Sequence, residues 1–339
     1  MKIYFFDTKK FDIESFTKYD TNNEFKYYDT RLTKDTVYLA KGADAICVFV
    51  NDVINKEVID KLYEYGIKLI LLRCAGYNNV DLKYCYNKIH VFRVPAYSPY
   101  AVAEHAIALL LTLIRKTHKA YIRTRNFNFS IEGLEGFDLH EKTIGVIGTG
   151  KIGKAFIDIA NGFGANVIAY DKYKSENINY VSLDELFAKS DIISLHCPLS
   201  EDTYHLINID SINKMNKQPI IVNTSRGGLI NTADLLEALK SKKLKGACLD
   251  VYEEESNIFF KDYSSEIIDD ETIQGLINLP NVIVTSHQAY LTSDALDNIA
   301  KTTIDNYNDY FSNGYGDNEL CYGCKKVDEC MKNRNKKCF

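Results

Sequence analysis

The fold is decided by the stretch Thr143-Ile-Gly-Val-Ile-Gly-Thr-Gly-Lys-Ile-Gly153. An apolar run with strand character leads into three glycines spaced G-x-G-x-x-G, and a helical pattern follows over residues 154–160. A second apolar run, residues 166–170, ends at Asp171. A strand, a glycine turn, a helix and a second strand closed by an acid together make the unit that holds a dinucleotide.

Each glycine has its own task in such a unit. Gly148 permits a tight turn, Gly150 lets the backbone approach a pyrophosphate, and Gly153 lets the helix pack closely on the strand. The helix N-terminus offers unpaired N–H groups and a positive dipole end to the phosphates. Asp171 is placed to accept hydrogen bonds from the adenosine ribose, and its charge would repel a 2′-phosphate. We therefore expect NAD as the cofactor; the alternative is a purely structural glycine turn.

Composition narrows the function classes. The chain has 339 residues, so two domains are expected, and its 46% apolar and 26% charged residues are typical of a globular enzyme. A net charge of −5 argues against a nucleic-acid partner. We expect no signal segment and no membrane span. Five of the nine cysteines are scattered through apolar strands and helices, which predicts reduced thiols and a cytoplasmic location: Cys47, Cys74, Cys85, Cys197 and Cys248.

Strand and helix patterns alternate over residues 1–95 and again over residues 143–286, which predicts an α/β protein with two doubly wound, Rossmann-like parallel sheets. A helical pattern over residues 293–311 has no strands left to join, so we expect it to pack on the first domain and make that domain discontinuous. The expected divisions are a substrate domain (1–99 plus 292–320), a NAD-binding domain (100–291) and a Cys-rich tail (321–339). The two chain crossings predict a cleft that holds the active site. The strands expected in the first domain are 2–6, 45–50, 68–73 and 91–94.

Polar residues follow three strands of the second domain, where ligands of open α/β sheets bind. Arg226 follows the run 220–223, an acidic turn ending in Glu255 follows Leu249, and His287 follows the run 282–285. Arginine can clamp a carboxylate, and histidine can exchange a proton near neutral pH. A carboxylate on the other ring nitrogen fixes the tautomer and favours the imidazolium form.

Structural readings of the same residues stay open from position alone. The arginine can be solvated or ion-paired, the histidine can be structural, and residues 253–255 can be an exposed acidic turn. Among the other histidines, His196 also sits at a strand end, which makes it the main rival for proton transfer.

Several ordered strings resemble the D-2-hydroxyacid dehydrogenase family, most closely its NAD-dependent fermentative D-lactate dehydrogenases. The resemblance extends from Met1 to about Phe311. The matching strings are Arg73–Leu82, Val94–Pro99, Ala101–His105, Gly145–Gly153, Asp191–Pro198, Asn223–Gly227, Asp250–Glu253 and Ser286–Tyr290.

The resemblance implies hydride transfer from NADH to C2 of pyruvate or another 2-keto acid. Arg226 would bind the substrate, His287 would protonate the keto oxygen, and Glu255 would pair with His287. The substrate side would be completed by the backbone of Ala75 and Gly76 and by Tyr97 and Tyr290. Tyr290 stands where several lactate-type relatives carry phenylalanine, so its hydroxyl either bonds the substrate or points to solvent. The positions that would contact the cofactor are Gly148, Gly150, Lys151, Ile152, Gly153, Asp171, Cys197, Pro198, Thr203, Thr224, Ser225 and Asp250.

The resemblance also implies a homodimer or homotetramer, and no nucleic-acid or membrane partner. Two functional alternatives stay open: an enzyme for bulkier 2-keto acids, giving 2-hydroxyisocaproate or phenyllactate, and a non-catalytic regulator that senses NAD. The tail carries Cys321, Cys324, Cys330 and Cys338 in a spacing that fits no usual zinc pattern. We expect an extension without metal there, with a metal site or redox-sensitive disulfides as alternatives.

Overall fold

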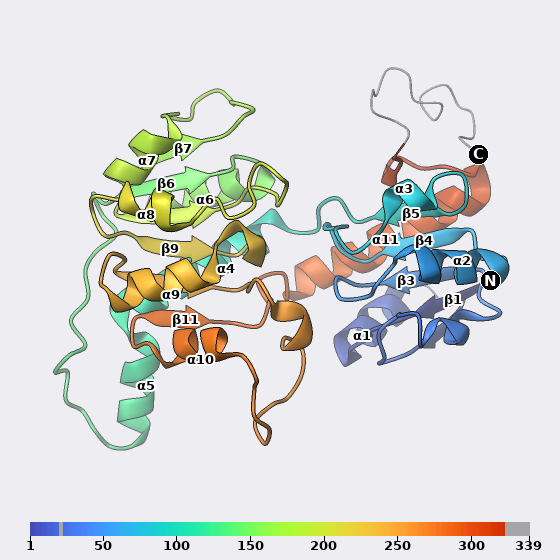
Figure 1. Ribbon diagram of the computed structural model, residues 1–339, viewed down its shortest axis with the longest axis horizontal. Helices are drawn as coiled ribbons and strands as arrows, with labels where there is room; N and C mark the ends of the chain where they lie inside the picture. The colour runs from blue at the N-terminus through green and yellow to red at the C-terminus, as the bar shows by residue number, and fades with distance from the viewer. Residues whose placement is uncertain (20–22, 323–339) are drawn as a thin grey trace. The chain divides into compact units, whose positions relative to one another are not determined.

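The computed structural model describes residues 1–19 and 23–322 of the chain. It divides into two compact units (Figure 1). The first unit is Met1–Ser98 together with the described residues from Leu291 onward, and the second is Pro99–Tyr290. The divisions expected from the sequence fall after residues 99 and 291, and the substrate-binding and NAD-binding roles of the two units stay predictions.

The first unit is built on a sheet with the strand order β12-β5-β4-β3-β1-β2. All neighbours are parallel except β12, which is antiparallel to β5. The strands are β1 (Lys2–Phe5), β2 (Glu24–Tyr27), β3 (Ala45–Val48), β4 (Leu69–Leu72), β5 (His90–Arg93) and β12 (Glu319–Leu320). The sequence did not predict β2 or β12, because both are short edge strands without a buried apolar run.

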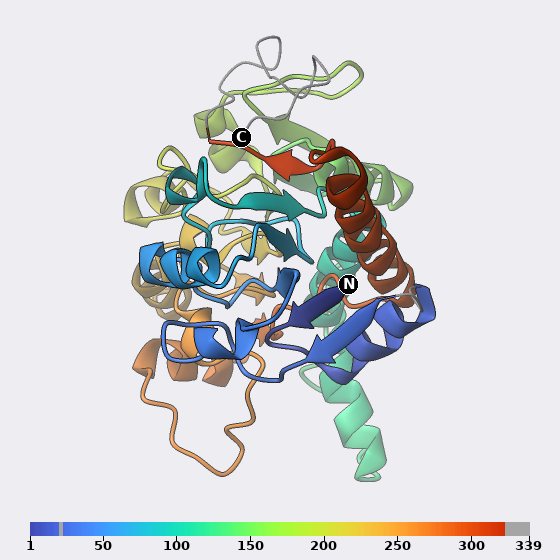
Figure 2. The same cartoon turned by 90° about the vertical axis from the view of Figure 1, so that its right-hand side faces the viewer.

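Helices cover both faces of this first sheet. One face carries η1 (Val37–Ala40), α2 (Lys56–Glu64) and α3 (Leu82–Cys85), which pack into one apolar cluster with β3 and β4. The other face carries α1 (Lys10–Tyr19) and the long α11 (Ser293–Asn313), which pack against each other (Figure 2). The C-terminal helix therefore joins the first unit, as the lack of remaining strands predicted.

The second unit has a fully parallel sheet with the order β11-β10-β9-β8-β6-β7. A bridge between Ala169 and Tyr180 extends it by one position beyond β7. The order therefore reverses at β6, the strand that carries the glycine turn, as in dinucleotide-binding sheets. The strands are β6 (Thr143–Ile147), β7 (Asn166–Tyr170), β8 (Ile192–Leu195), β9 (Ile220–Asn223), β10 (Gly246–Leu249) and β11 (Val282–Val284).

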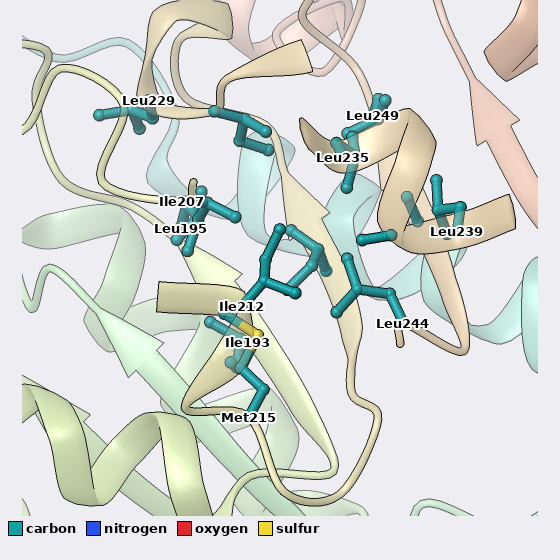
Figure 3. Close-up of a cluster of buried hydrophobic side chains, with 14 of the residues drawn as sticks. Ile193, Leu195, Ile207, Ile212, Met215, Leu229, Leu235, Leu239, Leu244 and Leu249 are labelled. Atoms are coloured by element: carbon teal, nitrogen blue, oxygen red, sulfur yellow. The ribbon is translucent and has the colours of Figure 1, made fainter. Parts of the chain in front are cut away.

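Two apolar layers enclose the second sheet. One layer packs α4 (Pro99–Arg115) and α6 (Lys151–Gly162) on the strands. The other packs α7 (Leu183–Lys189), α8 (Ile209–Asn213), α9 (Thr232–Lys240) and α10 (Glu271–Asn278) on the opposite face. Figure 3 shows side chains of β8, α8 and α9 meeting in that second layer. Because helices cover both faces of this sheet, a ligand can reach it only at the edge where the strands end.

Two consecutive helices follow the crossing into the second unit. Lys116 has a left-handed backbone (φ 51°) and separates α4 from α5 (Thr117–Arg125). No residue of α5 is buried, and the helix projects from the unit in Figure 1. Within the described part of the chain, no helix is both long and apolar enough to cross a membrane.

Candidate active site

Two of the three glycines in the turn after β6 are required by close backbone packing. Gly148 has a φ of 95°, and a Cβ there would lie 2.5 Å from the Cys197 backbone nitrogen. A Cβ on Gly153 would lie 2.0 Å from the Gly148 carbonyl oxygen. The turn therefore has the tight strand-to-helix geometry that the spacing predicted.

Gly150 differs, because nothing of the protein lies within 4 Å of where its Cβ would stand. The space beside it is open, which fits close approach by a ligand. Gly150 is also the N-cap of α6 and leaves the helix without a side-chain cap. The first N–H groups of this helix are therefore available to phosphate oxygens. Thr224, directly after β9, offers a further contact. Its hydroxyl is buried and has no hydrogen-bond partner among the described residues, which fits a ligand contact.

Asp171 at the end of β7 is held as a carboxylate. Its Oδ2 accepts hydrogen bonds from the Thr149 N–H (2.6 Å) and hydroxyl (3.1 Å), and its Oδ1 accepts from the Tyr173 N–H (2.8 Å). Partial burial alone would raise the pKa of Asp171, but these hydrogen bonds outweigh it and lower that pKa. An ionised acid at this position fits NAD. The sequence reading missed Thr149, although it stands between the first two glycines, and Tyr180, whose hydroxyl lies 2.7 Å from that of Thr149.

The three predicted catalytic residues follow neighbouring strands in register. Asn223 of β9 pairs with Leu249 of β10, and Leu249 pairs with Val284 of β11. The segments that carry Arg226, Glu255 and His287 therefore start from one edge of the sheet. A Cβ on Gly227 would lie 2.1 Å from the Tyr252 carbonyl, so the turn after β9 packs directly on the segment that leads to Glu255.

His287 and Glu255 form a direct pair. Their Nδ1 and Oε1 atoms lie 2.7 Å apart, and the side chains are 15% and 18% exposed. The second carboxylate oxygen of Glu255 accepts a hydrogen bond from the Tyr252 N–H (3.0 Å), which fixes the orientation of the acid. The predicted partnership of these two residues therefore exists in the fold. Its chemical consequence is that Nε2 is the ring nitrogen left for another molecule.

Asp250 organises the turn that presents His287. Its buried carboxylate accepts hydrogen bonds from the Thr285 hydroxyl (2.6 Å), the Gln288 N–H (2.9 Å) and the Ala289 N–H (2.8 Å). Its main-chain carbonyl accepts from the His287 N–H (2.7 Å). His287 itself has a φ of 54°, a backbone conformation unusual for a residue with a side chain. The hydrogen bonds of Asp250 therefore stabilise a strained turn.

Those bonds also set the charge of Asp250. Burial alone would raise the pKa of Asp250, but hydrogen bonds from His105, Thr285 and the two N–H groups outweigh it and hold that pKa below its usual range. The sequence reading assigned Asp250 to the cofactor. The structure shows its carboxylate engaged by its own chain, and a cofactor contact stays a prediction.

Arg226 is half-buried and held through its backbone. Asn223, which is fully buried, donates from its amide to the Arg226 carbonyl (2.9 Å) and accepts from the Ser225 N–H (3.0 Å). The guanidinium donates from Nη1 to the Ser225 carbonyl (2.7 Å). Within the described residues this is its one hydrogen bond, so Nε and Nη2 are left for an anion. Among the described residues, no hydrogen bond or ion pair joins Arg226 to His287 or Glu255. The segments that carry Arg226 and Glu255 meet where Gly227 packs on the Tyr252 backbone.

His205 and His196 are engaged elsewhere. His205 pairs with Glu253, which also accepts from the hydroxyls of Tyr204 and Thr232. The acidic turn is therefore divided, because Glu253 serves His205 and Glu255 serves His287. The pKa of the His196 imidazole is lowered to about 3 by burial, and its Nε2 lies 2.9 Å from the Ser194 hydroxyl. A ring that is uncharged at neutral pH and bonded inside the fold is unsuited to donate a proton.

The remaining predicted cofactor residues cluster around the glycine turn. The Ser225 hydroxyl donates to the Cys197 carbonyl (2.7 Å), and the Thr203 hydroxyl donates to the Pro198 carbonyl (2.7 Å). Both side chains therefore hold the segment that follows β8. Burial raises the pKa of the Cys197 thiol to about 11, which keeps it protonated. Lys151 and Ile152 open α6. Contact of any of them with NAD stays a prediction.

The predicted substrate residues of the first unit follow two of its strands. Ala75 and Gly76 come after β4, and Tyr97 comes after β5, with its carbonyl bonded by the amide of Asn298 (2.7 Å). Tyr290 of the second unit is 8% exposed, so its side chain does not stand out in solvent. A shared cleft lined by both groups stays a prediction.

The last prediction from the sequence concerns metal binding by the cysteines of the tail. Within residues 1–19 and 23–322, no group of three or more His, Cys, Asp or Glu side chains could hold a metal ion. Cys321 is an unpaired thiol, whereas Cys324, Cys330 and Cys338 lie outside the described residues, so the expectation for the tail stays untested.

Comparison with known proteins points to one family. A family model described as "D-isomer specific 2-hydroxyacid dehydrogenase, NAD binding domain" matches residues 107–289. A 2-hydroxyacid dehydrogenase homolog of Haemophilus influenzae is 48% identical over 316 residues, covering 90% of this chain and 95% of the relative. The apo structure of D-lactate dehydrogenase from Escherichia coli superposes with a TM-score of 0.84 at 43% identity, covering 94% and 100%. D-lactate dehydrogenase from Aquifex aeolicus, solved with NAD and lactic acid, gives 0.82 at 34% identity, covering 91% and 95%.

The hydrogen bonds of Asp250 lead to a stability prediction. Asn at position 250 has one acceptor oxygen, so Asp250→Asn leaves at least one buried N–H unpaired, and we expect the free energy of unfolding to fall by about 1–3 kcal/mol per orphaned donor. Because the folded pKa of Asp250 is lowered, its contribution is complete above the unfolded pKa of about 3.9 and is lost as pH falls through the folded pKa. Urea unfolding across pH should show wild type and variant converging below about pH 4. The exposed Asp269→Asn is the control; an equal deficit of Asp250→Asn at every pH would contradict the assignment.

Proposed function

The chain belongs to the D-isomer specific 2-hydroxyacid dehydrogenases, which use NAD, and from this premise we propose that it reduces pyruvate to D-lactate. The observation that carries the proposal is the His287–Glu255 pair. The strands that precede His287, Glu255 and Arg226 are neighbours and end at the same edge of the sheet. A proton donor and a carboxylate clamp are the two groups that reduction of a 2-keto acid requires from the protein.

When bound, NADH supplies the hydride that reduces C2 of the keto acid. His287 holds the proton for the keto oxygen at Nε2, because Glu255 accepts from Nδ1 and keeps that nitrogen occupied. Arg226 presents Nε and Nη2, which can bind the substrate carboxylate and polarise the keto oxygen. Together the two cationic groups stabilise negative charge as it develops on that oxygen. In the oxidative direction, His287 accepts the proton at the same nitrogen.

The backbone N–H groups of Ala75 and Gly76 complete the carboxylate site in this proposal, and Tyr97 and Tyr290 line the pocket. NAD binds the glycine turn and Asp171, with Thr224, Ser225, Cys197, Pro198 and Asp250 beside it. The unpaired hydroxyl of Thr224 and the uncapped α6 terminus support this placement. None of the described cysteines forms a disulfide, which supports a cytoplasmic location.

His287→Gln tests the proton-transfer role. We expect kcat for pyruvate reduction to fall by about 10²- to 10⁴-fold, because glutamine keeps hydrogen bonding but supplies no titrating proton. NADH affinity, measured by fluorescence titration, should change little. The matched control is His205→Gln, which alters the other histidine–glutamate pair on a residue that also has a positive φ (50°). Wild-type kcat in His287→Gln would refute the assignment.

The substrate proposal is tested with a series of 2-keto acids. The D-lactate dehydrogenases among the relatives support pyruvate. We therefore expect kcat/KM for NADH oxidation to be highest with pyruvate, by about tenfold over 2-ketobutyrate, 2-ketoisocaproate and phenylpyruvate. A maximum at a bulky keto acid would replace pyruvate and leave the mechanism intact. No turnover with any keto acid would contradict the catalytic proposal and favour an NAD-sensing regulator.

A homodimer is part of the same proposal, with the segment from α5 to residue 131 as its contact. This segment exposes Tyr121, Phe127, Phe129 and Ile131 to 60%, 84%, 74% and 82%, an unusual run of apolar side chains for a monomer. We expect sedimentation velocity to show a dimer for wild type and a monomer for the double variant Phe127→Glu, Ile131→Glu. Ile267→Glu, at a site 92% exposed elsewhere in the same unit, should stay dimeric. A double variant that sediments like wild type would exclude this contact.

A further inference from the structure

The turn after β4 has its carbonyl oxygens bonded on the protein side. The Cys74 carbonyl accepts from the Val94 N–H (3.2 Å), the Ala75 carbonyl from Nη1 of Arg93 (3.0 Å), and the Gly76 carbonyl from the Cys74 thiol (3.2 Å). Three consecutive peptide groups are therefore fixed through their oxygens.

The amide groups of the same turn are left without partners. Neither the Ala75 N–H nor the Gly76 N–H has a hydrogen-bond acceptor within residues 1–19 and 23–322. Because a trans peptide is planar, its N–H points away from its C=O. No cis peptide occurs in the described chain. With the Ala75 oxygen held by Arg93, the Gly76 N–H is turned to the opposite side, where it can meet an anion.

Arg93 is itself held firmly. As the last residue of β5 it is paired with Leu72 of β4. Its N–H donates to the Asn318 carbonyl (3.2 Å), and its carbonyl accepts from the amide of Asn306 (2.9 Å), which is 2% exposed and also bonded by Asn318. Its guanidinium lies 5.2 Å from the ring centroid of Tyr77, so it contacts the turn at two points.

We infer that Arg93 is a positioning residue for the substrate carboxylate: it fixes the Ala75–Gly76 peptide so that the Gly76 N–H faces the substrate, and the Cys74 thiol holds the next peptide. Arginine suits the role, because its guanidinium donates to the Ala75 carbonyl while lying over the Tyr77 ring. The inference rests on the proposed function, in which this turn binds the carboxylate of a 2-keto acid.

The test compares Arg93→Met, Arg93→Lys and wild type by steady-state kinetics with pyruvate. Loss of a charge-assisted hydrogen bond that orders the turn should raise KM about 10- to 100-fold for Met and less for Lys, with kcat within about threefold. The inhibition constant of oxamate, a carboxylate of similar shape that cannot accept a hydride, should rise in parallel. NADH affinity should be unchanged, and it can be read directly from NADH fluorescence because the chain has no tryptophan. Arg31→Lys, a half-buried arginine of the same unit that ion-pairs with Asp7, is the control.

A second pair of variants separates positioning from direct contact. Cys74→Ala removes the thiol donor to Gly76 and should raise KM for pyruvate, whereas Cys74→Ser keeps a donor and should restore it. Wild-type KM and oxamate inhibition in Arg93→Met would overturn the inference. So would normal kinetics in Cys74→Ala beside an impaired Arg93→Met, because Arg93 would then act on substrate itself. So would equal loss of pyruvate and NADH affinity with a lower melting temperature, because the role would then be structural. Failure of the proposed function is distinguishable, since wild type would then show no turnover.

Discussion

The site depends most on the hydrogen bonds that the buried carboxylate of Asp250 accepts. This carboxylate gathers the Thr285 hydroxyl and two successive N–H groups, and so closes the turn after β11 around one charge. His287 lies inside that turn with a positive φ, a conformation that a side chain adopts only when its surroundings enforce it. Glu255 then meets His287 from the end of the neighbouring strand. The parallel sheet supplies the alignment, and Asp250 converts that alignment into a defined position for the imidazole.

Side-chain hydrogen bonds also fix the turns after other strands of this chain. Asn223 holds the turn that carries Arg226, and Thr149 holds Asp171 beside the glycine turn. In the first unit, Arg93 holds the peptide after Ala75. In each case a polar side chain forms hydrogen bonds with main-chain groups of a short turn. The other polar groups of that turn are left to bind a ligand. The cost of burying a polar atom is offset by full hydrogen bonding, and the result is a preorganised surface for an anionic ligand.

Much of this could be predicted from sequence, because local signals carry it. The glycine spacing, the apolar runs and the acid at the second strand end indicate the dinucleotide unit, and parallel topology places Arg226, Glu255 and His287 at one edge. Other features have no local signal. Strand β2 alternates between exposed and half-buried residues, and the break at Lys116 falls on a residue with no turn preference. The role of Asp250 depends on partners 35 to 39 positions away, which spacing alone does not reveal.

The central claim is that Asp250 acts through the position of His287, and a double-mutant cycle on kcat/KM for pyruvate tests it most directly. If Asp250 only positions the histidine, Asp250→Asn should slow wild type but change little in a His287→Gln background, so the double variant should resemble His287→Gln. Losses that multiply in the double variant at saturating NADH would contradict the account, because Asp250 would then act on catalysis by a route other than His287.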